Sequence, residues 1–130
     1  MSYPTDLKYS EEHEWIRVRE DNTAYIGITH HAQSELGDIV YVEVETLDEY
    51  VEKGEVFGIV EAVKTTSDLY MPVSGRVLEF NSKIDESDGD EPGLINSDPY
   101  GEGWIIKIQL SDPSELEDLM EPTEYKALVS

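Results

Sequence analysis

Short segments in which apolar and polar residues alternate recur along most of the 130 residues. Alternation with a period of two is typical of half-buried β-strands, because successive side chains of a strand point to opposite faces. It predicts strands over residues 15–19, 23–28, 39–45, 55–62, 69–71, 76–80 and 104–110. Turn-forming residues such as Asp21-Asn22 and Gly75 separate them, as expected for antiparallel neighbours.

Helical signals are fewer and confined to two places. Thr29 can cap a short helix over residues 30–36, which Gly37 can end. Asp112-Pro113-Ser114-Glu115 has the composition of a helix start, and Leu116, Leu119 and Met120 follow at helical spacing. A second short helix can begin at Pro122, so short helices are predicted near residues 30–36 and 113–128.

Many short strands with few helices predict a mainly β fold of two packed antiparallel sheets or a flattened barrel. A chain of 130 residues is of the size of one domain, so residues 1–130 are expected to form a single unit.

Charge and cysteine content narrow the range of functions. Thirty acidic residues against nine basic ones give a net charge of −21. Such a chain repels phosphates, which argues against nucleic acid and anionic membrane surfaces and favours basic protein partners. The chain has no cysteine, which excludes disulfides and thiolate catalysis, so any sulfur chemistry must be supplied by a cofactor.

No metal site is predicted. The acidic segment from Ser82 to Pro92 lacks the EF-hand spacing, because Asp90 and Asn96 occupy the sixth and twelfth positions counted from Asp85. It is expected to be a solvated loop. His30 and His31 are adjacent and point in different directions on a helix.

Lys64 stands between two predicted strands, in the segment Glu61-Ala62-Val63-Lys64-Thr65-Thr66-Ser67-Asp68-Leu69-Tyr70-Met71-Pro72-Val73-Ser74-Gly75. A lysine at the tip of a hairpin holds a primary amine away from the body of the protein. Acylation of that amine removes its charge and can mount a cofactor on a flexible arm. An ordinary surface lysine is the alternative at this point.

Four motifs favour a modified lysine over an ordinary surface lysine, because together they resemble one known family. The segment around Lys64 resembles the lipoyl-attachment segment of the glycine cleavage H-protein family, with Ala62 where serine is usual. Three other motifs resemble the same family in the same order, from residue 9 to residue 104. They are Tyr9–Trp15, the pair Ile26–Gln33 and Leu36–Val40, and Gly93–Trp104. The resemblance implies the barrel-sandwich fold of lipoyl and biotinyl carriers.

The resemblance also implies a carrier rather than an enzyme. Lipoate on Lys64 would take an aminomethyl group from a pyridoxal-phosphate glycine decarboxylase to a tetrahydrofolate-dependent aminomethyltransferase. Dihydrolipoyl dehydrogenase would then reoxidise the dithiol, and a separate lipoylating enzyme would attach the cofactor. These four enzymes are the implied partners.

By the same resemblance, Glu14, His31 and Asp68 line a cleft that holds the loaded arm, with Glu12 nearby. The carboxylate of Glu14 is expected to pair with the cationic aminomethyl group. Glu61 and Asp68, which flank Lys64, can instead serve recognition by the lipoylating enzyme.

Other carriers remain as alternatives. Biotinyl lysines usually stand between methionines, whereas Lys64 stands between Val63 and Thr65. Lipoyl domains of 2-oxo acid dehydrogenases lack the segment from Asn96 to Trp104. A carrier of octanoyl or lipoyl groups in cofactor assembly would use the same lysine and stays open, as does an unmodified β-domain with a structural role.

The chain has no apolar run of transmembrane length, and its first residues lack a basic or apolar leader. A cytoplasmic bacterial or archaeal protein is expected, with a mitochondrial location only if a transit peptide precedes this sequence.

Overall fold

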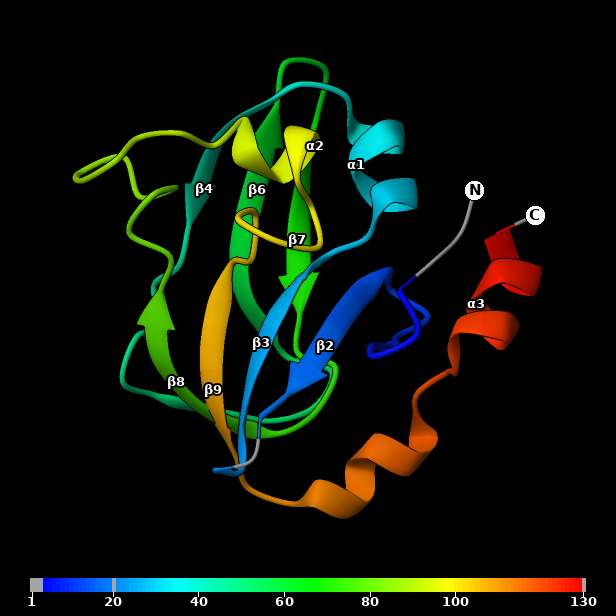
Figure 1. The fold of residues 1–130 in the computed structure, drawn as a ribbon. Helices are drawn as coiled ribbons and strands as arrows, with labels where there is room; N and C mark the ends of the chain where they lie inside the picture. Colours follow the sequence, from blue (N-terminus) through cyan, green and yellow to red (C-terminus); the bar gives the residue numbers. More distant parts are fainter. Residues whose placement is uncertain (1–3, 20, 130) are drawn as a thin grey trace.

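The computed structural model of the chain describes residues 4–19 and 21–129. Its architecture is two antiparallel sheets that face each other across a hydrophobic core, with short helices at the edges (Figure 1). The mainly β class and the two sheets predicted from the alternating pattern are confirmed.

The larger sheet has six strands in the order β1-β2-β3-β9-β8-β5. Their bounds are β1 Lys8–Tyr9, β2 Glu14–Val18, β3 Thr23–Ile28, β9 Ile106–Leu110, β8 Gly75–Phe80 and β5 Tyr50–Val51. The smaller sheet has three strands in the order β4-β6-β7, with bounds β4 Ile39–Glu43, β6 Val56–Ala62 and β7 Thr66–Tyr70. Sequence patterns located seven of these nine strands to within a few residues.

The two remaining strands, β1 and β5, are two residues long. Two residues cannot display an alternating pattern, so neither strand has a signal in the sequence. Each forms because a longer strand offers it a pairing edge, β2 for β1 and β8 for β5.

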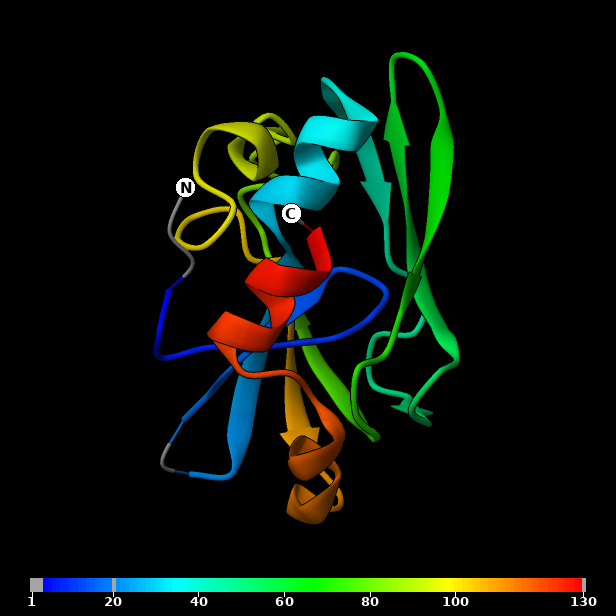
Figure 2. The ribbon, with the colours of Figure 1, turned by 90° about the vertical axis from the view of Figure 1, so that its right-hand side faces the viewer.

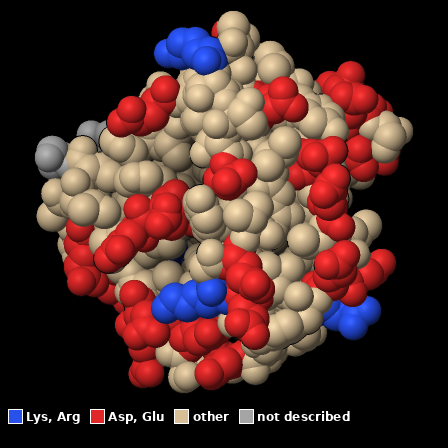
Figure 3. All heavy atoms as spheres, turned by 180° about the vertical axis from the view of Figure 1, so that it is seen from behind, with Lys and Arg blue, Asp and Glu red and all other residues tan. Residues whose placement is uncertain are grey.

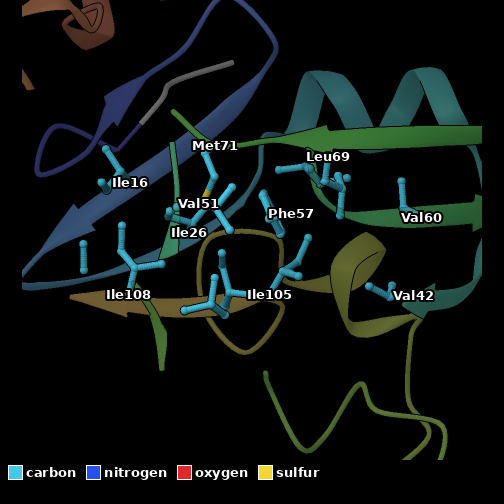
Figure 4. Close-up of a cluster of buried hydrophobic side chains, with 14 of the residues drawn as sticks. Ile16, Ile26, Val42, Val51, Phe57, Val60, Leu69, Met71, Ile105 and Ile108 are labelled. Carbon is cyan, nitrogen blue, oxygen red and sulfur yellow. The ribbon is translucent and has the colours of Figure 1, made fainter. Parts of the chain in front are cut away.

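Branched aliphatic side chains from both sheets fill the space between them (Figure 4). Ile26 and Ile108 come from the larger sheet and Val60 and Leu69 from the smaller one, and all four are at most 2% exposed. This packing fixes the smaller sheet against the larger one, and with it the position of the hairpin formed by β6 and β7.

The helices are α1 His30–Leu36, α2 Leu94–Ser97, the 3₁₀ helix η1 Pro113–Asp118 and α3 Pro122–Val129. The predicted cap of α1 is present, since Thr29 Oγ1 accepts a hydrogen bond from the Ala32 amide at 3.2 Å. Helix α2 was not predicted, because its four residues are too few to show a period.

The prediction of helical spacing through Leu119 and Met120 was wrong. The 3₁₀ helix begins with an Asp112 side-chain cap and ends at Asp118. Leu119 is extended, and Met120 exchanges two backbone hydrogen bonds with Tyr9, at 3.0 and 2.8 Å. Backbone pairing with a distant segment therefore ends the helix before its apolar pattern does.

Close packing of Trp15 over Gly27 generates a first prediction. Trp15 is fully buried and donates its indole N–H to the Pro99 carbonyl at 2.9 Å, and a Cβ on Gly27 would lie 2.7 Å from Trp15 Cζ2. Gly27→Ala should lower the free energy of unfolding by about 1–3 kcal/mol, because the ring must shift. Gly93→Ala is the control, since a Cβ there meets open space. Urea unfolding of both variants checks this, and an unchanged midpoint for Gly27→Ala would contradict it.

Candidate functional site

Lys64 lies in the three-residue turn that joins β6 to β7, as predicted. The Ala62 amide donates to the Thr65 carbonyl at 2.7 Å, which closes the turn. The Val63 amide donates to the Asp38 carbonyl at 3.0 Å, which ties the turn to the residue just before β4. Lys64 itself is exposed, at the end of a hairpin that projects beyond the rest of the smaller sheet (Figure 1).

The side chain of Lys64 rests on Gly37. A Cβ at Gly37 would lie 3.1 Å from Lys64 Cε and 3.6 Å from Nζ, so any other residue there would press on the lysine stem. Gly37 also has a positive φ of 85°, which L-residues rarely adopt. Glycine at this position therefore ends α1 and leaves room for the lysine.

Asn96 holds the corner between α1 and β4 in place. Its Oδ1 accepts the Ile39 amide at 2.9 Å, and its Nδ2 donates to Gln33 Oε1 at 2.8 Å and to the Gly37 carbonyl at 2.9 Å. One side chain of α2 thus fixes the surface on which Lys64 lies.

A cavity of about 200 Å³ opens beside this hairpin, and its walls come from α1, the start of β2 and the strands β3, β6 and β7. Figure 2 shows α1 beside the hairpin of β6 and β7. All four residues predicted to line a cleft contribute to its wall. The complete lining is Glu12, His13, Glu14, Ile28, His31, Ala32, Glu35, Leu36, Val60, Ser67, Asp68 and Leu69. The cavity is therefore apolar at its base and acidic around it, and among the described residues no lysine or arginine lines it.

Glu14 is the buried acid of this cavity. It is 2% exposed. Its Oε1 accepts the Ser10 hydroxyl at 2.8 Å and its Oε2 accepts the Tyr70 amide at 3.3 Å. Burial raises the pKa of the Glu14 carboxyl to about 8, an effect that these two hydrogen bonds oppose and the neighbouring charge of Glu12 adds to.

With this pKa, Glu14 is largely protonated at neutral pH in the unloaded protein. The reason is desolvation, since an isolated carboxylate out of water is less stable than the neutral acid. The carboxyl therefore becomes charged only as the pH approaches about 8, or if a cation close by stabilises the anion. The expected pairing of its carboxylate with a cationic aminomethyl group stays a prediction, and it requires loss of that proton.

The other three predicted residues lie at the wall with different degrees of exposure. His31, on α1, is half-buried and its Nε2 lies 3.3 Å from Glu35 Oε1. Asp68, on β7, and Glu12 are exposed, so their carboxylates stay hydrated at the mouth of the cavity.

Two residues near the cavity had no assigned role in the sequence, His13 and Tyr125. Their side chains are joined by a 2.9 Å hydrogen bond between His13 Nδ1 and the Tyr125 hydroxyl. The His13 ring lies 4.8 Å from that of His31, and burial together with this neighbour lowers the pKa of His13. The two residues are 112 positions apart, so only the fold reveals the pairing.

The C-terminal helix thereby supports the cavity wall. Tyr125 on α3 is fully buried, stacks on Tyr9 with ring centroids 4.7 Å apart, and is hydrogen bonded to Thr29 Oγ1 at 2.7 Å. Thr29 caps α1, so α3 and α1 are connected through one tyrosine hydroxyl.

None of the helices in the described part of the chain has the length and apolar character needed to cross a membrane.

Comparison with known proteins identifies relatives along the whole chain. Residues 7–130 match the family described as Glycine cleavage H-protein. The chain is 52% identical over 130 residues to the glycine cleavage system H protein of Bacteroides thetaiotaomicron, covering 100% of this chain and 99% of the relative. It is 54% identical over 124 residues to that of Symbiobacterium thermophilum, covering 95% and 93%.

A solved structure agrees with these relatives. The crystal structure of a glycine cleavage system H protein from Mycobacterium marinum superposes with a TM-score of 0.86 at 36% sequence identity, covering 97% of this chain and 98% of that one. The arrangement of both sheets is therefore shared with that protein.

The raised pKa of Glu14 generates a prediction about stability. The unfolded chain loses this proton near pH 4.5, whereas the folded chain keeps it up to about pH 8. Between these values the folded state binds more protons, so the free energy of unfolding should fall as pH rises. Glu14→Gln mimics the protonated acid and removes the titration.

Urea unfolding of both proteins between about pH 5 and pH 8 checks this, because the linkage relation places the effect roughly in that window. Over this range the free energy of unfolding of wild type should fall relative to that of Glu14→Gln. The fall should be about 1.4 kcal/mol for each unit of pKa difference between the folded and unfolded states. Parallel stability curves for the two proteins would contradict the buried, protonated assignment.

Proposed function

The chain belongs to the glycine cleavage H-protein family, a family of carriers, and on that basis we propose that Lys64 bears lipoate and that the cavity beside it shelters the loaded arm. One observation carries this proposal. An exposed lysine amine on a hairpin turn lies beside a cavity whose wall holds a buried, titratable acid. A purely structural β-domain would not require an exposed lysine next to a cavity with a buried acid.

The residues around Lys64 fit a covalently attached acyl arm. Amide formation uses the lysine amine as nucleophile, and an exposed amine at a hairpin end is open to a second enzyme. Lipoate would supply there a dithiolane that carries the aminomethyl group and then two electrons. The protein contributes tethering, which raises the effective concentration of the cargo at each partner enzyme.

Glu14 would hold the cargo by exchanging a proton for a cation. The amine of an aminomethyl group is cationic at neutral pH, and a cation removed from water needs an anionic partner. As the amine enters the cavity, Glu14 would release its proton and accept a charge-assisted hydrogen bond. Asp68 and Glu12 at the mouth attract the same charge, and His31 completes the wall.

The aliphatic base of the cavity would keep bulk water from the cargo. Ile28, Val60 and Leu69 are all buried and line it from three different strands. Exclusion of water protects an aminomethyl group that hydrolyses to ammonia and formaldehyde.

A role in octanoyl or lipoyl transfer would use the same lysine. An octanoyl group is uncharged at its far end and gains nothing from a buried acid. The Glu14 carboxyl therefore favours the cationic cargo of glycine cleavage over the neutral acyl cargo of cofactor assembly.

The partners that follow are the pyridoxal-phosphate glycine decarboxylase, the tetrahydrofolate-dependent aminomethyltransferase, dihydrolipoyl dehydrogenase and a lipoylating enzyme. We infer that the chain itself performs no catalysis and works as one domain in the cytoplasm of a bacterium, as the organisms of its relatives support.

The attachment site is tested by substitution of Lys64. Lys64→Arg keeps the charge but offers no amine to acylate, so in vitro lipoylation should leave it unmodified while its fold is retained. Lys53→Arg is the matched control, because Lys53 also lies on an exposed connection between strands and pairs with Asp118 at 3.2 Å. Peptide mapping by mass spectrometry should find the lipoyl group on Lys64 alone. Modification at another lysine would overturn the assignment.

The shelter is tested by the lifetime of the loaded protein. Glu14→Gln cannot form the anion, so it should release ammonia and formaldehyde about tenfold faster than wild type in the absence of the aminomethyltransferase. A hydrogen bond to a charged group contributes about 1.5–3 kcal/mol, and 1.4 kcal/mol corresponds to tenfold.

Glu11→Gln serves as the control for that measurement. It removes a neighbouring exposed acid that does not line the 200 Å³ cavity, so the loaded variant should decay at the wild-type rate. Equal decay of loaded wild type and Glu14→Gln would place the protective group elsewhere.

A further inference from the structure

A second and larger hollow of about 590 Å³ lies away from Lys64, between β4, β8 and the loop of residues 82–92. It shares no lining residue with the cavity beside Lys64. In Figure 1, β4, β8 and this loop lie on the left, whereas α1, β2 and α3 lie on the right. A molecule bound in this hollow, called the β4–β8 groove below, would leave the arm and its cavity uncovered.

The lining of the β4–β8 groove combines an apolar floor with an acidic rim. Seven of its thirteen residues are aliphatic or aromatic, four are acids and two are serines, and none is basic. They are Tyr41, Val42, Glu43, Val44, Leu47, Leu78, Glu79, Phe80, Ser82, Asp85, Glu86, Ser87 and Trp104. Such a surface is complementary to a segment that presents apolar side chains and lysine or arginine together.

The acidic side of the groove is built into the fold. The loop of residues 82–92 is anchored by Ile84, which is 1% exposed, and by backbone hydrogen bonds from the Gly89 amide to Ser82 and from the Glu91 amide to Lys83, at 2.9 and 2.8 Å. The expectation of a loop with solvated acids holds for most of its carboxylates, yet its backbone is fixed. Glu86 and Asp85 are therefore held at the groove.

Little positive charge within the molecule offsets these acids. Lys107 Nζ lies 3.8 Å from Glu79, and the Tyr41 hydroxyl donates to Glu43 at 3.2 Å. The pKa of Tyr41 is raised by desolvation and then by Glu43 and Glu86, as expected where the potential is negative. On the face opposite to the view of Figure 1, acids are spread widely with only a few basic side chains among them (Figure 3).

We propose that the β4–β8 groove is a docking surface for a basic amphipathic segment of an enzyme that receives the arm of Lys64. The segment would place apolar side chains on Leu78 and Phe80 and its cations against the acidic rim, with an aromatic face available at Trp104. Body and arm would then be held at separate places, so the arm could enter the enzyme while the groove keeps the two proteins together. This proposal rests on the carrier function proposed above.

The groove itself is tested without lipoate or enzyme. The probe is a short synthetic peptide of alternating lysine and leucine, titrated into the full chain with NMR detection. We expect the indole N–H signal of Trp104 to shift while that of Trp15, buried elsewhere, stays in place. Peptides with glutamate in place of lysine, or serine in place of leucine, should bind at least about tenfold more weakly, equivalent to about 1.4 kcal/mol. Shifts spread evenly over the acidic surface, or an unmoved Trp104 signal, would overturn the proposal.

Two matched charge variants extend the test to the enzymes. The groove variant is Glu43→Gln with Glu79→Gln and Glu86→Gln, and the control is Glu49→Gln with Glu52→Gln and Glu117→Gln. Both sets remove three carboxylates, so the net charge of each protein changes from −21 to −18, and the control residues are exposed and do not line the groove. Any general loss of electrostatic attraction is therefore equal in the two proteins.

Each lipoylated protein is assayed as substrate of the glycine decarboxylase, the aminomethyltransferase and dihydrolipoyl dehydrogenase. With at least one enzyme the groove variant should show a KM raised about tenfold over the control variant, with kcat retained. Equal KM values for the two variants with all three enzymes would overturn the groove. Failure of wild type itself to serve as substrate would instead overturn the carrier function, so the two failures are distinguishable.

An uncharged pair of variants tests the apolar floor. Leu47, 45% exposed, lines the groove, whereas Val56, 41% exposed, does not. Leu47→Thr should weaken peptide binding and Val56→Thr should not, since both remove exposed apolar surface but only one removes it from the groove. Equal binding by both variants would contradict an apolar contribution.

Discussion

A carboxyl group shut away from water can lower its free energy in two ways, by taking up a proton or by receiving a cation. The carboxyl of Glu14 is in this situation. The Ser10 hydroxyl and the Tyr70 amide hold both of its oxygens, from a loop before β2 and from the end of β7, and burial raises its pKa to about 8. The carboxyl is therefore held in position and is largely protonated at neutral pH. We infer that a cationic cargo would gain more from this carboxyl than a neutral acyl chain would.

The fold places the side-chain amine of Lys64 and the carboxyl of Glu14 on the same side of the molecule. The hairpin of β6 and β7 carries Lys64 at its end, and β7 also supplies Asp68 and the Tyr70 amide. Helix α1 contributes the cavity wall at His31 and ends at Gly37, on which the lysine stem lies. Side chains from distant segments lock these parts, Asn96 from α2 and Tyr125 from α3. The short helices, which add little to the core between the sheets, are thus needed to shape the site.

Much of the fold follows from local pattern, because alternation records which face of a strand is buried. The strands through Ile26, Val60 and Ile108 are found in this way, and Lys64 is found because a lysine stands between two such segments. The cavity has no comparable signal. Its grouping of Glu12, Glu14, His31 and Asp68 was expected from family resemblance. These positions come together because the hairpin of β6 and β7 in one sheet and helix α1 lie against the start of β2 in the other sheet. The protonation of Glu14 and the contact between His13 and Tyr125 depend on burial and on segments far apart in sequence, which residue types alone do not reveal.

The central claim is that a cationic cargo on Lys64 replaces the proton of Glu14. Carbon-13 NMR of the Glu14 side-chain carboxyl, followed through a pH titration, measures this proton directly. The lipoylated protein without cargo should titrate at about pH 8, and the aminomethyl-loaded protein should show Glu14 ionised well below that value. The same titration midpoint in both forms would show that the cargo does not meet this carboxyl, and would contradict the account.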